Sequence, residues 1–154
     1  MQIQANKQLK IPNGKDLKIT IILPYFNEEI GLELYENVRE TLEKNRVKKE
    51  NVKLTRIPGA LELPFTAQKE IESQEKPNAI IALGIIIQGE TSHYDYVCNE
   101  TFNGLMNVQL KLKTPIIFGI LTCKNKQQAQ ERASKNGLNK GKDFAEAAII
   151  QSHL

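Results

Sequence analysis

The feature that most constrains the fold is residues 79–85, which are apolar at nearly every position. A half-buried strand alternates apolar and polar residues, whereas an uninterrupted apolar run of this length is typical of a strand covered on both faces. Such a strand belongs to the interior of a parallel sheet between two layers of helices. Even extended to Ile87, the run is far shorter than the roughly 20 residues that a membrane helix needs.

Other β-rich runs alternate with amphipathic stretches along the chain. The expected strands are residues 18–23, 51–57, 79–85 and 116–121. The expected helices are residues 28–48, 61–73, a helix carrying Val97 to Leu112, 125–135 and 140–151. Four strand–helix alternations predict an α/β protein, a three-layer sandwich with a flavodoxin-like four-stranded parallel sheet with helices on both faces. One domain is expected over residues 1–154.

Composition agrees with one globular domain, because 40% apolar and 25% charged residues exclude a disordered chain. Residues 1–17 are polar and charged throughout and lack the apolar centre of a signal peptide. We therefore expect a soluble, cytoplasmic protein without a membrane partner. The net charge of +3 is too small to indicate a nucleic-acid partner.

Charge is distributed unevenly. From Lys111 to the C-terminus, eight basic residues oppose three acidic ones, a local net charge of +5. This excess fits either a solvated helix face or a site for a small anion. The two cysteines and two histidines lack the spacing of metal ligands, so neither a metal site nor a disulfide framework is expected.

In parallel α/β sheets, ligands bind outside the carboxyl ends of the strands. This rule selects residues 24–27, 57–62, 85–93 and 118–122 as candidate binding segments. Phe26 in the first segment can be a lid on the core or a platform for a ligand. Glu62 in the second can complement a helix dipole or accept hydrogen bonds from a polyol or an amide.

The third segment is the most informative because it ends in Gly-Glu-Thr-Ser-His. Gly89 lets the backbone approach a ligand, and Thr91 and Ser92 are suitable N-cap residues for the following helix. A capped turn explains these residues without a ligand, but N–H groups at a helix start also bind anions. His93 at the mouth of such a cleft can transfer protons near neutral pH.

Several well-known motifs are missing. The chain has no Gly-x-x-x-x-Gly-Lys-Ser/Thr loop, no Gly-x-Gly-x-x-Gly after a strand and no Gly-x-Ser-x-Gly elbow. Residues 24–27 offer neither the acidic cluster of a receiver domain nor the phosphate loop of a flavin carrier. Nucleoside triphosphates, dinucleotides and these two protein classes are therefore disfavoured.

Five motifs follow one another along the chain. They are Phe26-Asn27; Pro58-Gly59-Ala60-x-Glu62-x-Pro64; Ala82-Leu83-Gly84-x-x-Ile87-x-Gly89-x-Thr91-x-His93-Tyr94-x-Tyr96-Val97; Phe118-Gly119-x-Leu121-Thr122; and Gln128-Ala129 with Glu131-Arg132-Ala133 and Asn139-Lys140-Gly141. Together they resemble the 6,7-dimethyl-8-ribityllumazine synthase family of riboflavin biosynthesis. The resemblance covers residues 18–150, and the Gly-x-Thr-x-His stretch is its most specific part.

The resemblance implies a transferase that needs no cofactor. In the family's reaction, the 5-amino group of 5-amino-6-(D-ribitylamino)uracil attacks the ketone of 3,4-dihydroxy-2-butanone 4-phosphate. A Schiff base forms, phosphate is eliminated, and ring closure with loss of water gives the lumazine. An enzyme for this reaction mainly has to hold two small substrates together.

The resemblance also implies roles for individual residues. The pyrimidine and its ribityl chain would be bound by Phe26, Ala60, Leu61, Glu62, Ile85, Ile86, Ile87, Phe118 and Lys140. The phosphate would be bound by Glu90, Thr91 and Arg132, and His93 would shuttle protons. Phe118 and Lys140 would close the pocket from a neighbouring subunit.

Four positions depart from the family pattern. Leu61 stands where family members usually carry an aromatic residue, and Tyr25 and Gln88 occupy positions often held by arginine. Glu90 would repel a phosphate, so we expect its backbone N–H to bind and its side chain to face outward. The alternative function is that of a non-catalytic relative that binds a lumazine or flavin, or only assembles.

The family forms homopentamers, and in some members twelve pentamers close into an icosahedral shell. The resemblance therefore implies a homo-oligomer, a pentamer or a 60-mer, with riboflavin synthase as a possible partner. Residues 1–16 are expected to form an extended N-terminal arm, in which residues 9–12 can add a strand to a neighbour's sheet. The short turn at residues 135–139 slightly favours the shell.

Overall fold

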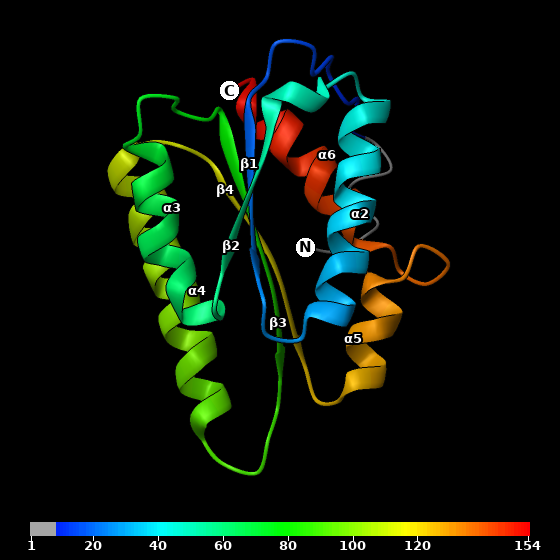
Figure 1. Cartoon of the computed structure of the whole chain (residues 1–154), viewed down its shortest axis with the longest axis vertical. Helices are drawn as coiled ribbons and strands as arrows, with labels where there is room; N and C mark the ends of the chain where they lie inside the picture. Colours follow the sequence, from blue (N-terminus) through cyan, green and yellow to red (C-terminus); the bar gives the residue numbers. More distant parts are fainter. Residues whose placement is uncertain (1–8) are drawn as a thin grey trace.

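The computed structural model describes residues 9–154, in which a parallel sheet lies between two layers of helices (Figure 1). The four strands are β1 (Ile19–Pro24), β2 (Val52–Ile57), β3 (Ala79–Ile87) and β4 (Ile116–Cys123). They are paired in the order β2-β1-β3-β4, and all pairs are parallel. The predicted three-layer α/β architecture is confirmed.

The helices divide between the two faces of the sheet (Figure 1). One face is covered by α2 (Glu28–Lys44), α5 (Lys126–Ala133) and α6 (Lys140–Ser152). The other face is covered by α3 (Leu63–Ile71) and α4 (His93–Leu112). Two 3-10 helices, η1 (Lys49–Asn51) and η2 (Ala60–Glu62), precede β2 and α3. Within residues 9–154, no helix combines the length and the apolar composition needed to cross a bilayer.

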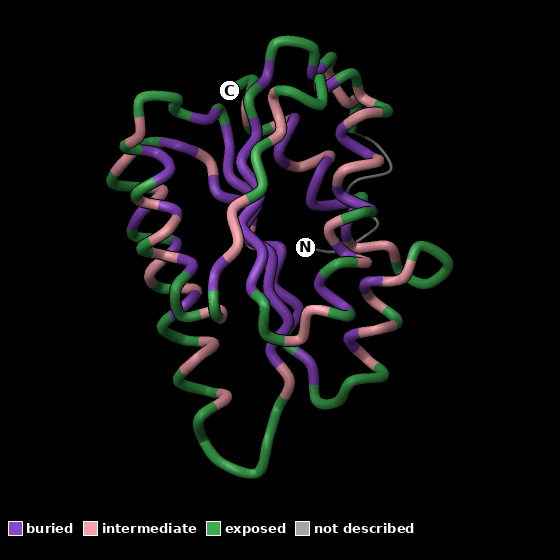
Figure 2. The backbone as a smooth tube through the Cα atoms, in the orientation of Figure 1, coloured by how far each residue is buried: buried purple, intermediate pink, exposed green. Residues whose placement is uncertain are grey.

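The two central strands are the most deeply buried part of the molecule (Figure 2). All six residues of β1 are buried, as are eight of the nine residues of β3. Successive side chains alternate between the two helical layers, as Ile21 and Ile22 do. The carboxyl ends of β1 and β3 are therefore fixed supports for the loops that follow them.

Some element boundaries differ from the expected ones. Helix α2 ends at Lys44 because Arg46 adopts a left-handed conformation, with φ 73°, and the Val47 N–H bonds back to the Leu42 carbonyl. Strands β3 and β4 each continue two residues further than expected, because their pairing extends to Ile87 and Cys123.

The predicted N-terminal arm lies partly outside the described residues, which begin at residue 9. Residues 9–12 form no strand within this chain, and Ile11 packs partly against its own core. Gly14 donates its backbone N–H to the Asn45 carbonyl at 2.9 Å, which ties the segment to the end of α2. Strand addition to a neighbouring subunit stays a prediction.

Candidate functional site

The segments after β1, β2 and β3 enclose a cavity of about 380 Å³, here named the strand-end cavity. Nine of the predicted site residues line it: Phe26, Ala60, Leu61, Glu62, Ile85, Ile86, Ile87, Thr91 and His93. Gly89, expected to let the backbone approach a ligand, also lines it. Sequence reasoning gave no role to four others that line it: Pro24, Gly59, Tyr94 and Val97. Tyr94 follows His93 directly in α4, and Val97 lies about one helical turn after both. This spacing could have indicated that Tyr94 and Val97 lie near His93.

Phe26 projects from the loop between β1 and α2. Its side chain is 73% exposed and lines the cavity, so it is a platform on the surface rather than a lid on the core. Asn27 adopts a left-handed conformation, with φ 58°, and its amide donates to the Ile85 carbonyl at 2.9 Å. This bond anchors the loop to β3 and fixes the direction in which Phe26 leaves the sheet.

The opposite wall is formed by residues 59–62. A Cβ atom on Gly59 would lie 3.2 Å from a Glu62 carboxylate oxygen, so glycine lets the carboxylate fold over the turn. The Glu62 carboxylate has no hydrogen-bond or ion-pair partner within the described chain, and its oxygens can accept bonds from a ligand. Leu61 is 46% exposed and adds an apolar surface to the same wall.

The floor of the cavity is the end of β3. Pairing between β1 and β3 ends at Ile22 and Ala82, whereas β3 continues to Ile87. The last residues of β3 therefore have no strand partner on the β1 side among residues 9–154. About half of their backbone N–H and C=O groups bond to β4, and those that point to the β1 side, apart from the Ile85 carbonyl bonded to Asn27, have no strand partner there.

The rim of the cavity carries its polar groups. His93 is exposed at the first position of α4, and its backbone N–H donates to the Thr91 hydroxyl at 3.3 Å. Glu90 is exposed and does not line the cavity. The N–H groups at the start of α4 form the kind of helix terminus that binds anions.

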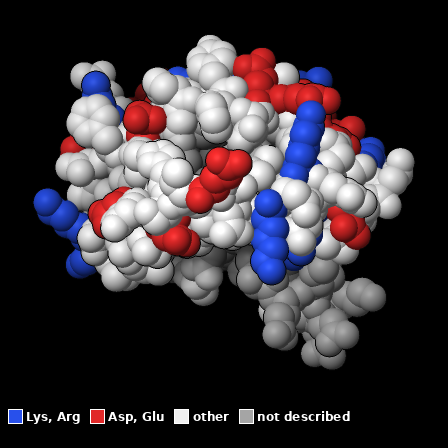
Figure 3. Space-filling view, turned by 90° about the horizontal axis from the view of Figure 1, so that it is seen from below, with Lys and Arg blue, Asp and Glu red and all other residues white. Residues whose placement is uncertain are grey.

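The strand-end cavity by itself is a poor site for a phosphate. Among the described residues, its lining contains the acidic Glu62 but neither lysine nor arginine. Acidic and basic side chains are mixed on this end of the molecule, so no continuous positive field covers it (Figure 3). A phosphorylated ligand therefore needs a cation from outside this cavity.

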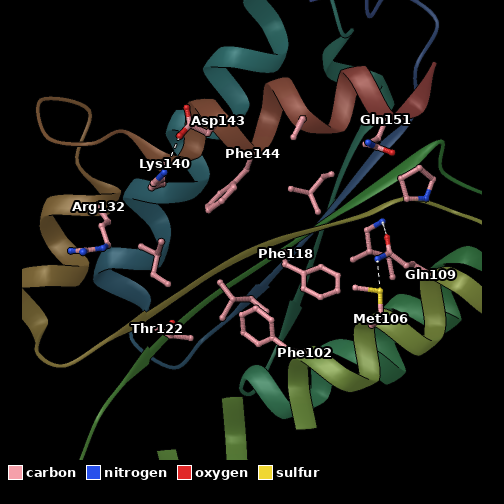
Figure 4. Close-up of a pocket in the computed structure, with 16 residues that line it drawn as sticks. Phe102, Met106, Gln109, Phe118, Thr122, Arg132, Lys140, Asp143, Phe144 and Gln151 are labelled. Atoms are coloured by element: carbon pink, nitrogen blue, oxygen red, sulfur yellow. Dashed lines mark hydrogen bonds and ion pairs between the residues drawn. The ribbon is translucent and has the colours of Figure 1, made fainter. Parts of the chain in front are cut away.

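Three predicted site residues lie elsewhere, in a second cavity of about 680 Å³ along the outer edge of β4. Phe118, Arg132 and Lys140 all line this β4-edge cavity, between α4 on one side and α5 and α6 on the other (Figure 4). The Phe118 ring contacts that of Phe102 edge to face, with ring centres 5.6 Å apart. The residues expected to bind the phosphate are thus divided between two cavities.

The two cations of the β4-edge cavity are held differently. Arg132 donates one N–H to the Gln128 carbonyl of its own helix at 3.1 Å and forms no ion pair within residues 9–154. Lys140 pairs with Asp143 at 3.1 Å, and both side chains are largely buried. Arg132 is therefore the cation with donors left for an anion, whereas the charge of Lys140 is already balanced.

The thiols and the phenol near these cavities are unsuited to nucleophilic catalysis. Burial raises the pKa of Tyr94, and a hydrogen bond with Thr122 offsets part of this rise. Burial also raises the pKa of Cys98 and of Cys123, although Arg132 opposes the rise at Cys123. These groups stay protonated near neutral pH, so they are weak nucleophiles. Within residues 9–154, no cluster of three or more His, Cys, Asp and Glu side chains could hold a metal ion.

The parallel three-layer fold defines a flavodoxin-like α/β protein, with a cavity at the strand ends where such folds bind ligands. Comparison with known families matches residues 16–154 to 6,7-dimethyl-8-ribityllumazine synthase. The chain belongs to this family of transferases, which acts in riboflavin biosynthesis. The resemblance inferred from the sequence motifs is confirmed.

Proposed function

We propose that the chain condenses 5-amino-6-(D-ribitylamino)uracil with 3,4-dihydroxy-2-butanone 4-phosphate to 6,7-dimethyl-8-ribityllumazine, with release of phosphate and water. Membership of the lumazine synthase family supports this reaction. The observation that carries the proposal is the meeting of nine predicted site residues in one cavity. Its volume of about 380 Å³ suits a substituted pyrimidine.

The pyrimidine ring stacks on Phe26 and directs its polar edge to the backbone of Ile85, Ile86 and Ile87. Free backbone groups at the end of β3 give this edge its partners. The ribityl chain lies along the wall made by Ala60, Leu61 and Glu62, where the unpaired carboxylate accepts hydrogen bonds from hydroxyl groups. Stacking and hydrogen bonding together orient the amino group that attacks the ketone.

The phosphate binds at the rim, where Thr91 and the Glu90 backbone N–H provide donors. The required cation is Arg132, and its position with Phe118 and Lys140 in the β4-edge cavity supports a contribution from a neighbouring subunit. Sequence reasoning assigned only Phe118 and Lys140 to a neighbour. We now include Arg132, whose planar guanidinium can bind the phosphate in a bidentate manner and stabilise it as a leaving group.

His93 moves the protons of the reaction. The condensation needs a proton removed from the attacking amine and protons delivered to the departing oxygens, and one exposed imidazole can do both in turn. His93 stands on the same rim as Thr91, next to the proposed phosphate position. Most of the remaining acceleration comes from holding the two substrates together.

A site shared between subunits requires an oligomer. We propose a homopentamer as the minimal active form, with a 60-subunit shell slightly favoured by the short turn before Asn139. The proposal extends to a cytoplasmic location and to riboflavin synthase as a possible partner. Neither a cofactor nor a metal ion has a part in the reaction.

Turnover of the two purified substrates, followed by lumazine fluorescence, tests the reaction. Product formation supports the enzyme, whereas binding of a lumazine without turnover supports the alternative, a non-catalytic relative. Leu61, in place of an aromatic residue, is the sequence feature that favours this alternative.

Co-expression of two variants with impaired activity tests the shared site. If His93 and Arg132 meet across an interface, co-expressed His93→Ala and Arg132→Ala chains should regain about a quarter of wild-type activity. Each site needs an intact His93 from one chain and an intact Arg132 from its neighbour, and random assembly brings these together in about one interface in four. The matched control combines His93→Ala with Phe26→Ala. Both residues line the strand-end cavity, so no intact site can form. Equal recovery in the two mixtures would contradict the shared site.

A further inference from the structure

Arg56 joins three parts of the chain at the carboxyl end of β2, where it lies opposite Leu23 in the register with β1. Its Nε donates to the Leu23 carbonyl at 3.1 Å, and its Nη2 pairs with the Glu28 carboxylate at 3.0 Å. Its guanidinium carbon lies 4.0 Å from the centre of the Tyr25 ring, within cation–π distance. Arg56 therefore links the end of β1, the following loop and the first turn of α2.

The loop that Arg56 crosses carries Phe26, the platform of the strand-end cavity. Because the Phe26 side chain is largely exposed, its position depends on the backbone rather than on packing. The Tyr25 N–H donates to the Ile57 carbonyl at 2.7 Å, and the Phe26 N–H donates to the Pro58 carbonyl at 3.2 Å. Ile57 and Pro58 directly follow Arg56 in the chain. Residues 56–58 therefore hold the loop in two ways, through the Ile57 and Pro58 carbonyls and through the Arg56 side chain.

The same segment leads into the opposite wall of the cavity. Residues 59–62 follow Pro58 and line the cavity together with Phe26. Arg56 thus connects two of the segments that line the cavity, the loop with Phe26 and residues 59–62. Thr91 and His93 lie on a different segment, after β3, and the hydrogen bonds, ion pair and ring contact of Arg56 do not involve them.

Arg56 is not placed to bind a substrate itself. It does not line the strand-end cavity, and its side chain is only 21% exposed. Glu28 balances its charge, its Nε donates to the Leu23 carbonyl, and the Tyr25 ring covers one face of the guanidinium. An effect of Arg56 on substrate binding must therefore act through the loop.

We propose that Arg56 is a positioning residue for the pyrimidine substrate, acting by holding Phe26 in the orientation that receives the ring. The inference rests on the proposed function, because it takes the pyrimidine as the ligand that stacks on Phe26. An arginine suits this task because its planar fork can donate in two directions while its face covers an aromatic ring.

Steady-state kinetics with each substrate varied in turn tests the proposal. Arg56→Ala is expected to raise the KM for the pyrimidine about three- to tenfold and to change the KM for the butanone phosphate by less than about twofold. Arg56→Lys should raise the pyrimidine KM less than Arg56→Ala does. It should not restore the wild-type KM, since an ammonium group cannot make all three contacts. The matched control is Arg39→Ala, which removes an arginine paired with the carboxylates of Glu36 and Glu43 and lining neither cavity.

A double-mutant cycle distinguishes positioning from a general loss of stability. In a Phe26→Ala background, Arg56→Ala should raise the pyrimidine KM little further, because the platform is already gone. If Arg56→Ala is too unstable to purify, Arg56→Lys serves in the same cycle. Equal rises of both KM values, or an additive cycle, would overturn the proposal.

Amide hydrogen exchange gives a readout that does not depend on turnover. The Tyr25 and Phe26 amides should exchange faster in Arg56→Ala than in wild type, and at wild-type rates in Arg39→Ala. Unchanged exchange at these two amides would also overturn the proposal. If the wild type forms no lumazine but exchange changes as expected, the proposed function fails while the linkage between Arg56 and the loop holds.

Discussion

His93 is the residue whose removal should affect the chemical step most directly. It is exposed on the rim of the strand-end cavity and is not part of the core, so His93→Ala should fold normally. We expect kcat to fall by about ten- to a thousandfold, which is the range for a general acid–base group or just below it. The loss should be partial, because the two substrates are still held together. An unchanged kcat, measured by lumazine fluorescence on folded protein, would exclude the role.

Arg132 has the clearest signature for a phosphate contact. Arg132→Ala should raise the KM for the butanone phosphate far more than the KM for the pyrimidine, and it should also lower kcat. The fall in kcat is expected because stabilisation of the leaving phosphate is needed in the transition state. Arg132→Lys should recover only part of both effects, since a point charge cannot replace the planar fork. Equal changes in both KM values would argue against the phosphate role.

Helix α5, which carries Arg132, is held mainly by polar contacts. Only Ala129 and Ala133 of the helix are buried. Four side-chain hydrogen bonds join α2 to α5 or to the turn that follows it. Three are made by Lys126 to Glu29, Gln130 to Glu33 and Lys135 to Glu40, and the fourth is the buried bond from the Asn37 amide to the Ala133 carbonyl at 2.8 Å. Two of these contacts, Lys126 to Glu29 and Lys135 to Glu40, are exposed ion pairs that salt screens, so the attachment of α5 to α2 should weaken as ionic strength rises.

Hydrogen exchange at different salt concentrations tests this weakness. Raising the salt concentration to about 1 M, where screening acts over about 3 Å, should speed exchange of the α5 amides relative to those of α2. The hydrogen bond from Lys135 also lowers the pKa of Glu40. Its stabilising effect is therefore present above the ordinary glutamate pKa and is lost as pH falls through the lowered value. Exchange that is insensitive to both salt and acid would contradict this view of α5.

Close approach of α6 to α2 depends on Gly141. A Cβ atom there would lie 2.7 Å from the Leu34 carbonyl oxygen and 3.0 Å from the Val38 nitrogen, both backbone atoms that cannot easily move. Gly141→Ala should therefore lower the free energy of unfolding by about 1–3 kcal/mol, as expected for overpacking. Denaturant unfolding measures this loss. Gly89→Ala is the control, because a Cβ there meets no atom within 4 Å.

The sequence predicted elements better than it predicted their contacts. The strands were recognisable because β1 and β3 are buried on both faces, which leaves an apolar run that no exposed segment imitates. The nine predicted residues of the strand-end cavity could be found because they lie at, or shortly after, the carboxyl ends of neighbouring parallel strands. Arg56 was missed because its partners come from another strand and a helix, with no spacing pattern to indicate them. The grouping of Arg132 with Phe118 depends on the tertiary arrangement around β4.

The sheet of residues 9–154 has two edge strands, β2 and β4, and the β4 edge borders a cavity. Within residues 9–154, β4 is paired on one side only, and the β4-edge cavity beside it is lined by Phe102, Phe118 and Phe144. Met106 and Leu110 add exposed apolar surface on α4, at 43% and 69% exposure. A bare strand edge next to an apolar hollow is a surface that soluble proteins usually cover.

We therefore expect the chain to assemble through the β4 edge, and we expect activity to depend on that assembly. Sedimentation at low micromolar concentration is expected to show at least a pentamer, and Met106→Glu should yield smaller, inactive species because a charge would be buried at the interface. His93→Ala, which alters only the strand-end cavity, should sediment like the wild type. A monomer with full activity would defeat the shared site, since Arg132 and His93 of one chain line different cavities. A pentamer that does not associate further would exclude only the shell, because pentamer and shell would contain the same fivefold interface.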